Sequence, residues 1–117
     1  HSLGIADAVT VLATDAASAD AAATLIANAV DLPGHPTIER APANLLSPDS
    51  DLGERLVTTG VGRLSRAEVD EALENGLIVA EDFAARDLIL SAALFLCGES
   101  RTCSTLKMIA AKEPAHA

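Results

Sequence analysis

The sequence has no Trp or Tyr and only 2 Phe in 117 residues. Aromatic side chains therefore cannot fill the interior, and the core must be aliphatic. Hydrophobic residues make up 50% of the chain, with Ala the commonest among them, and an Ala side chain buries little apolar area. This composition favours helices that pack closely against a sheet.

Basic residues are also scarce, because 8 Lys and Arg stand against 17 Asp and Glu and give a formal charge of −9. A field of this sign repels phosphate backbones and anionic lipid surfaces. No run approaches the roughly 18 apolar residues of a membrane span, and no basic segment leads into an apolar one as in a secretion signal. We therefore expect no nucleic acid and no membrane as partner, and a cytoplasmic location.

The chain contains only 2 cysteines, Cys97 and Cys103, without CxxC spacing or a neighbouring His that would indicate zinc. The segment between them is typical of a hairpin turn, so a cross-strand disulfide is geometrically conceivable. Free thiols in a reducing compartment are the preferred interpretation. A thiol nucleophile would need a base and a thiolate-stabilising neighbour, for which Arg101 is the sole candidate.

The first half of the chain predicts a strand, a helix and a long connection. β-Branched and apolar residues at 7–14 predict a largely buried strand inside a sheet. The Ala-rich residues 15–30 predict a helix, with Asp15 or Ser18 as its cap. Prolines, a glycine and a polar cluster at 36–53 predict an extended surface excursion.

A second helix is expected to begin at Ser65, because Ser65 and Glu68 have the spacing of a capping box. The pair Asn75-Gly76 is expected to bend or interrupt this helix. Apolar residues at helical spacing predict its core face, which would comprise Val69, Leu73, Ile78, Phe83 and neighbouring alanines.

Three further segments have the composition of strands. Residues 56–62 predict a strand weakened by its two glycines, and residues 88–96 with 102–109 predict a closing hairpin. The order strand, helix, strand, helix, strand, strand predicts an α+β fold, with helices packed on a mixed or antiparallel sheet. We expect one half-domain over residues 1–112 and a flexible tail at 113–117.

A polar stripe interrupts the apolar helix 15–30. Asp20, Thr24 and Asn28 recur every four positions and must share one helix face. A carboxylate and a hydroxyl one turn apart offer Mg²⁺ two hard oxygen ligands, with phosphates, carbonyls or water completing the octahedron. The alternatives are that this face meets solvent, or that Thr24 bonds back to the Asp20 carbonyl.

These residues carry a family resemblance. Residues 7–13, Asp-Ala-Val-Thr-Val-Leu-Ala, followed by residues 19–24, Ala-Asp-Ala-Ala-Ala-Thr, resemble the C-terminal half of ApbE-like proteins, the FAD:protein FMN transferase superfamily. Residues 2–8, 28–34 and 48–53 look similar to the stand-alone branch of that superfamily. The chain has Gly4-Ile5-Ala6-Asp7 where the transferases have a DPRTG-type segment.

The resemblance implies a site and a partner. Asp20 and Thr24 would bind the divalent metal, Mg²⁺, that holds the FAD pyrophosphate, so the implied ligands are FAD or FMN and the implied activity is flavin transfer. The implied α+β domain is completed by a missing N-terminal half or a second subunit, and an oligomer is expected. Because His1 is followed directly by the strand pattern, its position is interpreted as a cut, a subunit boundary or an artificial end.

Two other functions stay open at this stage. A small-molecule hydrolase that reuses the scaffold without flavin would use His35 as general base, with Asp7 and Asp31 as further candidates. His35 lies in a Pro-Gly-His-Pro turn, where a loop-capping role without catalysis is the alternative. The other possibility is a non-catalytic binding or assembly subunit, in which the polar stripe is an interface.

Overall fold

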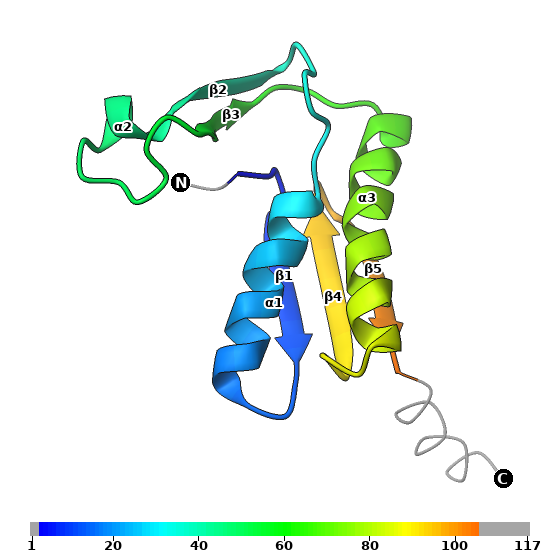
Figure 1. Ribbon diagram of the computed structural model, residues 1–117. Helices are drawn as coiled ribbons and strands as arrows, with labels where there is room; N and C mark the ends of the chain where they lie inside the picture. The colour runs from blue at the N-terminus through cyan, green and yellow to red at the C-terminus, as the bar shows by residue number, and fades with distance from the viewer. Residues whose placement is uncertain (1–2, 106–117) are drawn as a thin grey trace, which may run out of the picture.

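A three-stranded antiparallel sheet with two helices on one face forms the body of the protein in the computed structural model, which describes residues 3–105 (Figure 1). The strand order is β1-β4-β5. The strands are β1 (Ala8–Leu12), β4 (Ser91–Leu96) and β5 (Glu99–Ser104). The helices α1 (Ala16–Ala29) and α3 (Arg66–Ala85) lie side by side on the sheet. The expected α+β class with antiparallel pairing is confirmed.

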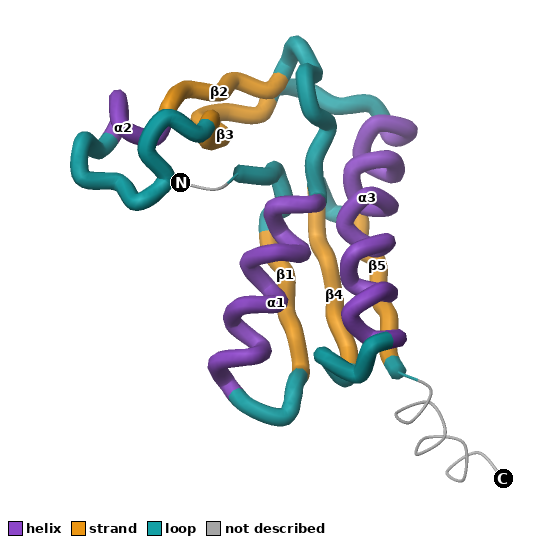
Figure 2. The backbone as a smooth tube through the Cα atoms, viewed as in Figure 1, coloured by secondary structure: helices purple, strands orange, loops and turns teal. Residues whose placement is uncertain are grey.

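A separate arm projects from one end of this body (Figure 2). It consists of β2 (Ile38–Pro42), the short helix α2 (Ala43–Leu46) and β3 (Leu56–Val61), with β2 and β3 paired antiparallel. The surface excursion expected at 36–53 is thus part of this arm, but it contains a strand and a short helix that the sequence did not predict. The segment forms β2 and α2 because it pairs with β3 and buries Ala43, a contact between distant residues that local composition does not reveal.

The core between helices and sheet is built from small side chains. Gly76 lies where an added Cβ would be 2.3 Å from Cγ2 of Val30 and 2.8 Å from Cδ2 of Leu94. The glycine therefore lets α3 approach α1 and β4, and it does not interrupt α3, contrary to expectation. Ile78 is also wrongly placed in the expected core, since it is 64% exposed. The buried face of α3 comprises Val69, Ala72, Leu73, Gly76, Ala80 and Ala84.

The sequence predicted that the first strand lies inside the sheet, but β1 lies at the end of the strand order. Among residues 3–105, β1 pairs only with β4 and forms an edge of the sheet, with side chains that are alternately exposed and half-buried. The helices cover only one face, so Thr10 and Leu12 stay exposed on the other. The apolar pattern of β1 thus reflects a sheet surface that no described segment covers.

The cap of α1 and the closing hairpin are confirmed, although β5 begins at Glu99 and not at residue 102. Asp15 caps α1 by accepting the Ser18 N–H at 2.7 Å. The β4–β5 hairpin closes through a two-residue turn with φ of 50° at Cys97 and 79° at Gly98, as a turn that matches strand twist requires. The expected strand to residue 109 and the tail at 113–117 extend outside the described residues.

Neither α1 nor α3 combines the length and apolar character that a bilayer-crossing helix needs, and no other helix in residues 3–105 does.

Candidate functional site

The polar stripe of α1 faces away from the sheet. Ala22 and Ile26 are buried against the core, and helical geometry places Asp20 and Thr24 on the opposite side, where both are exposed. The Thr24 hydroxyl donates a hydrogen bond to the Asp20 backbone carbonyl at 3.1 Å. The back-bonding alternative is therefore realised in the structure.

This bond leaves ligand capacity at both side chains. A hydroxyl that donates its single hydrogen still has lone pairs, and the Asp20 carboxylate has no hydrogen bond or ion pair to another side chain of residues 3–105. The two donors are hard oxygens of the kind that Mg²⁺ takes. In the described part of the chain, there is no group of three or more His, Cys, Asp or Glu side chains that could hold a metal ion by itself. A cation at Asp20 and Thr24 would thus draw most of its ligands from a bound molecule or water.

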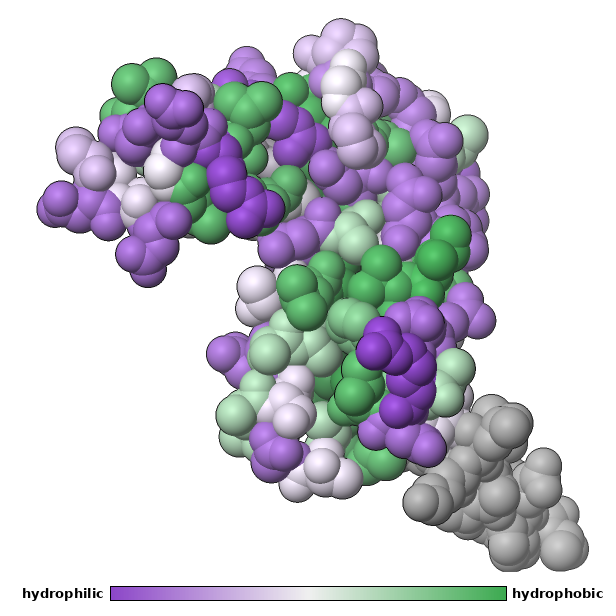
Figure 3. Space-filling view, in the orientation of Figure 1, coloured by the Kyte–Doolittle hydropathy of each residue, from purple (hydrophilic) through white to green (hydrophobic). Residues whose placement is uncertain are grey.

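One turn beyond Thr24, the stripe reaches a hollow of about 640 Å³ in the inner corner between α1 and the arm (Figure 3). Residues from the N-terminal segment, the end of α1, the following loop and the arm contribute to its walls. We call it the corner hollow, and it is lined by Leu3, Leu25, Asn28, Asp31, Pro33, Gly34, Arg40, Arg55 and Leu56.

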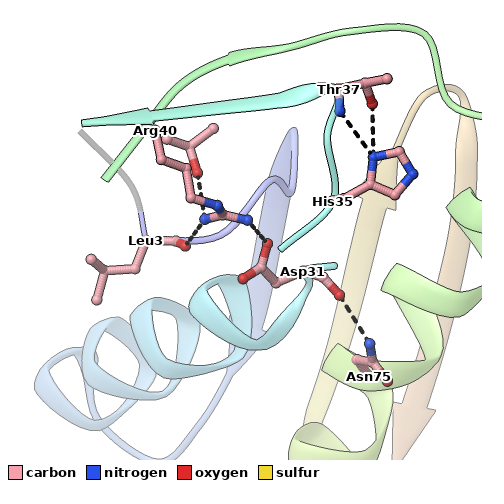
Figure 4. Close-up of polar contacts among 7 residues, drawn as sticks. Leu3, Asp31, His35, Thr37, Arg40 and Asn75 are labelled. Atoms are coloured by element: carbon pink, nitrogen blue, oxygen red, sulfur yellow. Dashed lines mark hydrogen bonds and ion pairs between the residues drawn. The ribbon is translucent and has the colours of Figure 1, made fainter. Parts of the chain in front are cut away.

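An ion pair forms one wall of the corner hollow (Figure 4). Nη2 of Arg40 lies 2.5 Å from Oδ1 of Asp31, and the side chains are 15% and 16% exposed, respectively. Nη1 of Arg40 also donates to the Leu3 carbonyl at 3.0 Å and to the Thr58 hydroxyl at 3.2 Å. Asn75 donates to the Asp31 backbone carbonyl at 2.9 Å. The network ties the arm, the N-terminal segment and α3 to the end of α1.

Arg55 is the second arginine of the corner hollow. Its backbone is fixed in the arm, because its carbonyl accepts the Ala43 N–H at 2.9 Å and its N–H donates to Leu52 at 3.0 Å. Its exposed guanidinium has no hydrogen bond or ion pair among residues 3–105. The Arg40–Asp31 pair is neutral as a unit, so Arg55 gives the hollow a net positive charge.

His35 lies at the start of the arm with both ring nitrogens engaged. The Thr37 N–H donates to Nδ1 at 3.2 Å, so Nδ1 is unprotonated and Nε2 carries the hydrogen that faces Oε2 of Glu68. Oε1 of Glu68 accepts the Ser65 N–H at 2.8 Å and closes the predicted capping box of α3. The Ser65 N–H, followed by the His35 ring, lowers the pKa of Glu68. His35 thus connects the loop before the arm to the start of α3.

The other residues of the hydrolase alternative lie in separate groups. Oδ2 of Asp7 accepts the Cys97 N–H at 2.8 Å and supports the β4–β5 turn. Asp31 is bound to Arg40. The structure therefore does not join Asp7, Asp31 and His35 in one hydrogen-bonded group.

Cys97 and Cys103 are free thiols, which is the interpretation that the sequence favoured over a disulfide. Cys103 pairs with Ala92, whereas Cys97 lies in the turn beyond Leu96. Four residues of strand at about 3.4 Å each separate the two positions, which is too far for a disulfide. Burial, followed by the charge of Glu81, raises the pKa of the Cys103 thiol. Arg101, the proposed thiolate neighbour, instead pairs with Asp70 at 2.8 Å.

Sequence reasoning missed Arg40 and Arg55. No motif marks either residue, because their roles depend on the β2–β3 pairing that brings the arm over the end of α1. The one available signal was their position: both are basic residues of a strongly acidic chain and lie within or beside the Pro-rich segment.

A family model described as "AbpE bacteria" matches residues 1–102. No curated protein and no solved structure matches the chain.

Proposed function

For this chain, which belongs to the family described as "AbpE bacteria", we propose that it forms one half of an ApbE-like protein that binds a flavin or nucleotide-like ligand with a divalent metal. The reaction proposed for the completed protein is transfer of a flavin. The exposed pair Asp20 and Thr24, which aims two hard oxygen donors away from the core, is the observation that carries the proposal.

Asp20 and Thr24 would hold the metal, Mg²⁺. The bond from Thr24 to the Asp20 carbonyl fixes the position of the hydroxyl, whose oxygen keeps lone pairs for a metal ion. When bound, Mg²⁺ would neutralise phosphate charge and polarise a phosphoryl oxygen. The net charge of −9 gives the chain a field that repels phosphate, and a bound cation would offset that repulsion at Asp20 and Thr24.

The corner hollow supplies room for the rest of the ligand. Asp20 and Asn28 are eight residues apart on one helix face, which corresponds to about 12 Å along α1. A stripe of this length suits an extended nucleotide-like ligand that runs from the metal site at Asp20 to the hollow beside Asn28.

The same proposal includes a covering partner, either an N-terminal half or a second subunit. β1 is an uncharged edge strand, and Leu12 and Phe95 are exposed on the face opposite the helices. Unpaired edges and apolar faces of this kind are typical contact sites for another segment. The free thiols agree with the reducing cytoplasm as the proposed location.

Flavin fluorescence tests the proposal. The full chain is titrated with FAD in Mg²⁺ and then in EDTA, and the titration is repeated with Asp20→Asn, Thr24→Val and the control Asp49→Asn. We expect Mg²⁺ to strengthen FAD binding about tenfold or more, and we expect only Asp20→Asn and Thr24→Val to lose that gain. Affinity that is equal in all variants would favour the non-catalytic alternative. The hydrolase alternative predicts a different pattern. A hydrolytic activity would persist without metal and in Asp20→Asn, but it would be lost in His35→Gln.

A further inference from the structure

The corner hollow has a charge and a shape of its own, distinct from the stripe at Asp20 and Thr24. Arg40 already serves Asp31, the Leu3 carbonyl and Thr58, so its guanidinium has little capacity left for a ligand. Arg55 has no such partner among residues 3–105. A cation beside a neutral ion pair, in an acidic chain, is a place where an anion binds in preference to the surrounding surface.

Two exposed leucines on different elements contribute to the walls of the hollow. Leu25 on α1 is 54% exposed and Leu56 on β3 is 55% exposed, and both line the hollow. A volume of about 640 Å³ lies within the range of small-molecule sites. The two exposed leucines offer apolar surface to a flat ring, which would cover area now in contact with water.

We propose that the corner hollow binds a phosphate-bearing ring compound without a metal ion, with the phosphate at Arg55 and the ring between Leu25 and Leu56. A guanidinium pairs with phosphate through two parallel N–H groups, which a lysine cannot do. This inference rests on the proposed function, since a flavin or nucleotide-like ligand supplies the ring and the phosphate. It assigns to Arg55 a contact that the Asp20 and Thr24 site does not make.

Asn28 and Arg40 complete the site in different ways. The Asn28 amide lines the hollow and offers a donor and an acceptor to ring heteroatoms. Arg40 acts as a positioning residue, because its bonds to Asp31 and Leu3 hold the arm over α1 and thus set the gap between Leu25 and Leu56.

FMN and riboflavin form a matched pair of probes, because they differ only in the phosphate. Both are titrated in EDTA against the full chain, Arg55→Gln, the control Arg63→Gln and Leu56→Ala. Arg63 is a suitable control because it is an exposed arginine eight positions after Arg55 and does not line the hollow. Circular dichroism of each variant confirms that it is folded.

We expect FMN to bind about tenfold more tightly than riboflavin. Arg55→Gln should abolish that difference, Leu56→Ala should weaken both ligands, and Arg63→Gln should change neither. Inorganic phosphate should displace FMN from the unmodified chain but not from Arg55→Gln. Equal affinities for FMN and riboflavin, no FMN binding at millimolar concentration, or an unchanged ratio in Arg55→Gln would each overturn the inference. If instead the Asp20 and Thr24 proposal fails, FAD binding to the unmodified chain does not depend on Mg²⁺. The results with FMN and riboflavin in EDTA then stay as expected.

Discussion

The guanidinium of Arg40 lies 2.5 Å from the carboxylate of Asp31, and this pair joins the arm to the end of α1. Both side chains are mostly buried, so neither charge is well solvated without the other. A two-stranded hairpin such as β2–β3 is marginally stable by itself. The ion pair and the bond to the Leu3 carbonyl therefore hold the arm against the body and shape the corner hollow.

Replacing Arg40 by Leu should destabilise the protein, because the Asp31 carboxylate then stays partly buried without a partner. We expect a loss of about 2 kcal/mol, below the roughly 3–5 kcal/mol of fully buried pairs. Urea unfolding measures it, with Arg63→Leu as a surface control that should change stability by less than about 0.5 kcal/mol. The double variant with Asp31→Asn should recover part of the loss, and strictly additive effects would show that the pair is not coupled.

Gly76→Ala should destabilise the protein although alanine favours helices by about 1 kcal/mol. The new Cβ would lie 2.3 Å from Cγ2 of Val30 and 2.8 Å from Leu94, so α3 would have to move away from α1 and β4. Overpacking of this kind costs about 1–3 kcal/mol. Thermal unfolding beside the exposed control Ile78→Ala provides the comparison. A Gly76→Ala protein at least as stable as the parent would contradict the close helix packing.

The capping box should contribute to stability in a way that depends on pH. The Ser65 N–H and His35 lower the pKa of Glu68 below its ordinary value of 4.5. The stabilisation is therefore present above that ordinary value and is lost as the pH falls through the lowered pKa of the folded state. In urea unfolding at several pH values, the stability difference between the parent and Glu68→Gln should be largest near neutrality and should narrow in acid. A difference that stays constant with pH would rule out the charge of Glu68 as its source.

The thiols should differ in reactivity. Cys97 is exposed in the β4–β5 turn, whereas Cys103 is half-buried and burial raises its pKa. Since the thiolate is the reactive form, iodoacetamide at pH 8 should modify Cys97 before Cys103. Peptide mass spectrometry over time distinguishes the two sites. Faster labelling of Cys103, or an intramolecular disulfide after mild oxidation, would contradict the register of β4 and β5.

Signals within a few residues were predictable from the sequence, while long-range contacts were not. The cap at Asp15 and the capping box of Ser65 and Glu68 depend on spacing alone, and the structure contains both. The packing role of Gly76 depends on the close approach of Val30, which lies 46 positions earlier in the sequence. A prediction based only on the tendency of glycine to break helices could not include this contact.

The candidate site likewise contains residues that the sequence pattern predicted and residues that it did not. The stripe of Asp20 and Thr24 follows from helical periodicity and was found. Arg40 and Arg55 enter the corner hollow only because β2 pairs with β3, and that pairing was missed because Pro42 at the end of β2 favours a loop when it is considered alone.

Electron paramagnetic resonance with Mn²⁺ in place of Mg²⁺ tests the central proposal most directly. Free Mn²⁺ gives a strong signal that diminishes when the ion is bound. We expect the chain and FAD together to diminish the signal more than the sum of their separate effects, and we expect this excess to disappear in Asp20→Asn and in Thr24→Val but not in Asp49→Asn. An excess that persists in both stripe variants, or no excess with the unmodified chain, would contradict a metal-bridged nucleotide at Asp20 and Thr24.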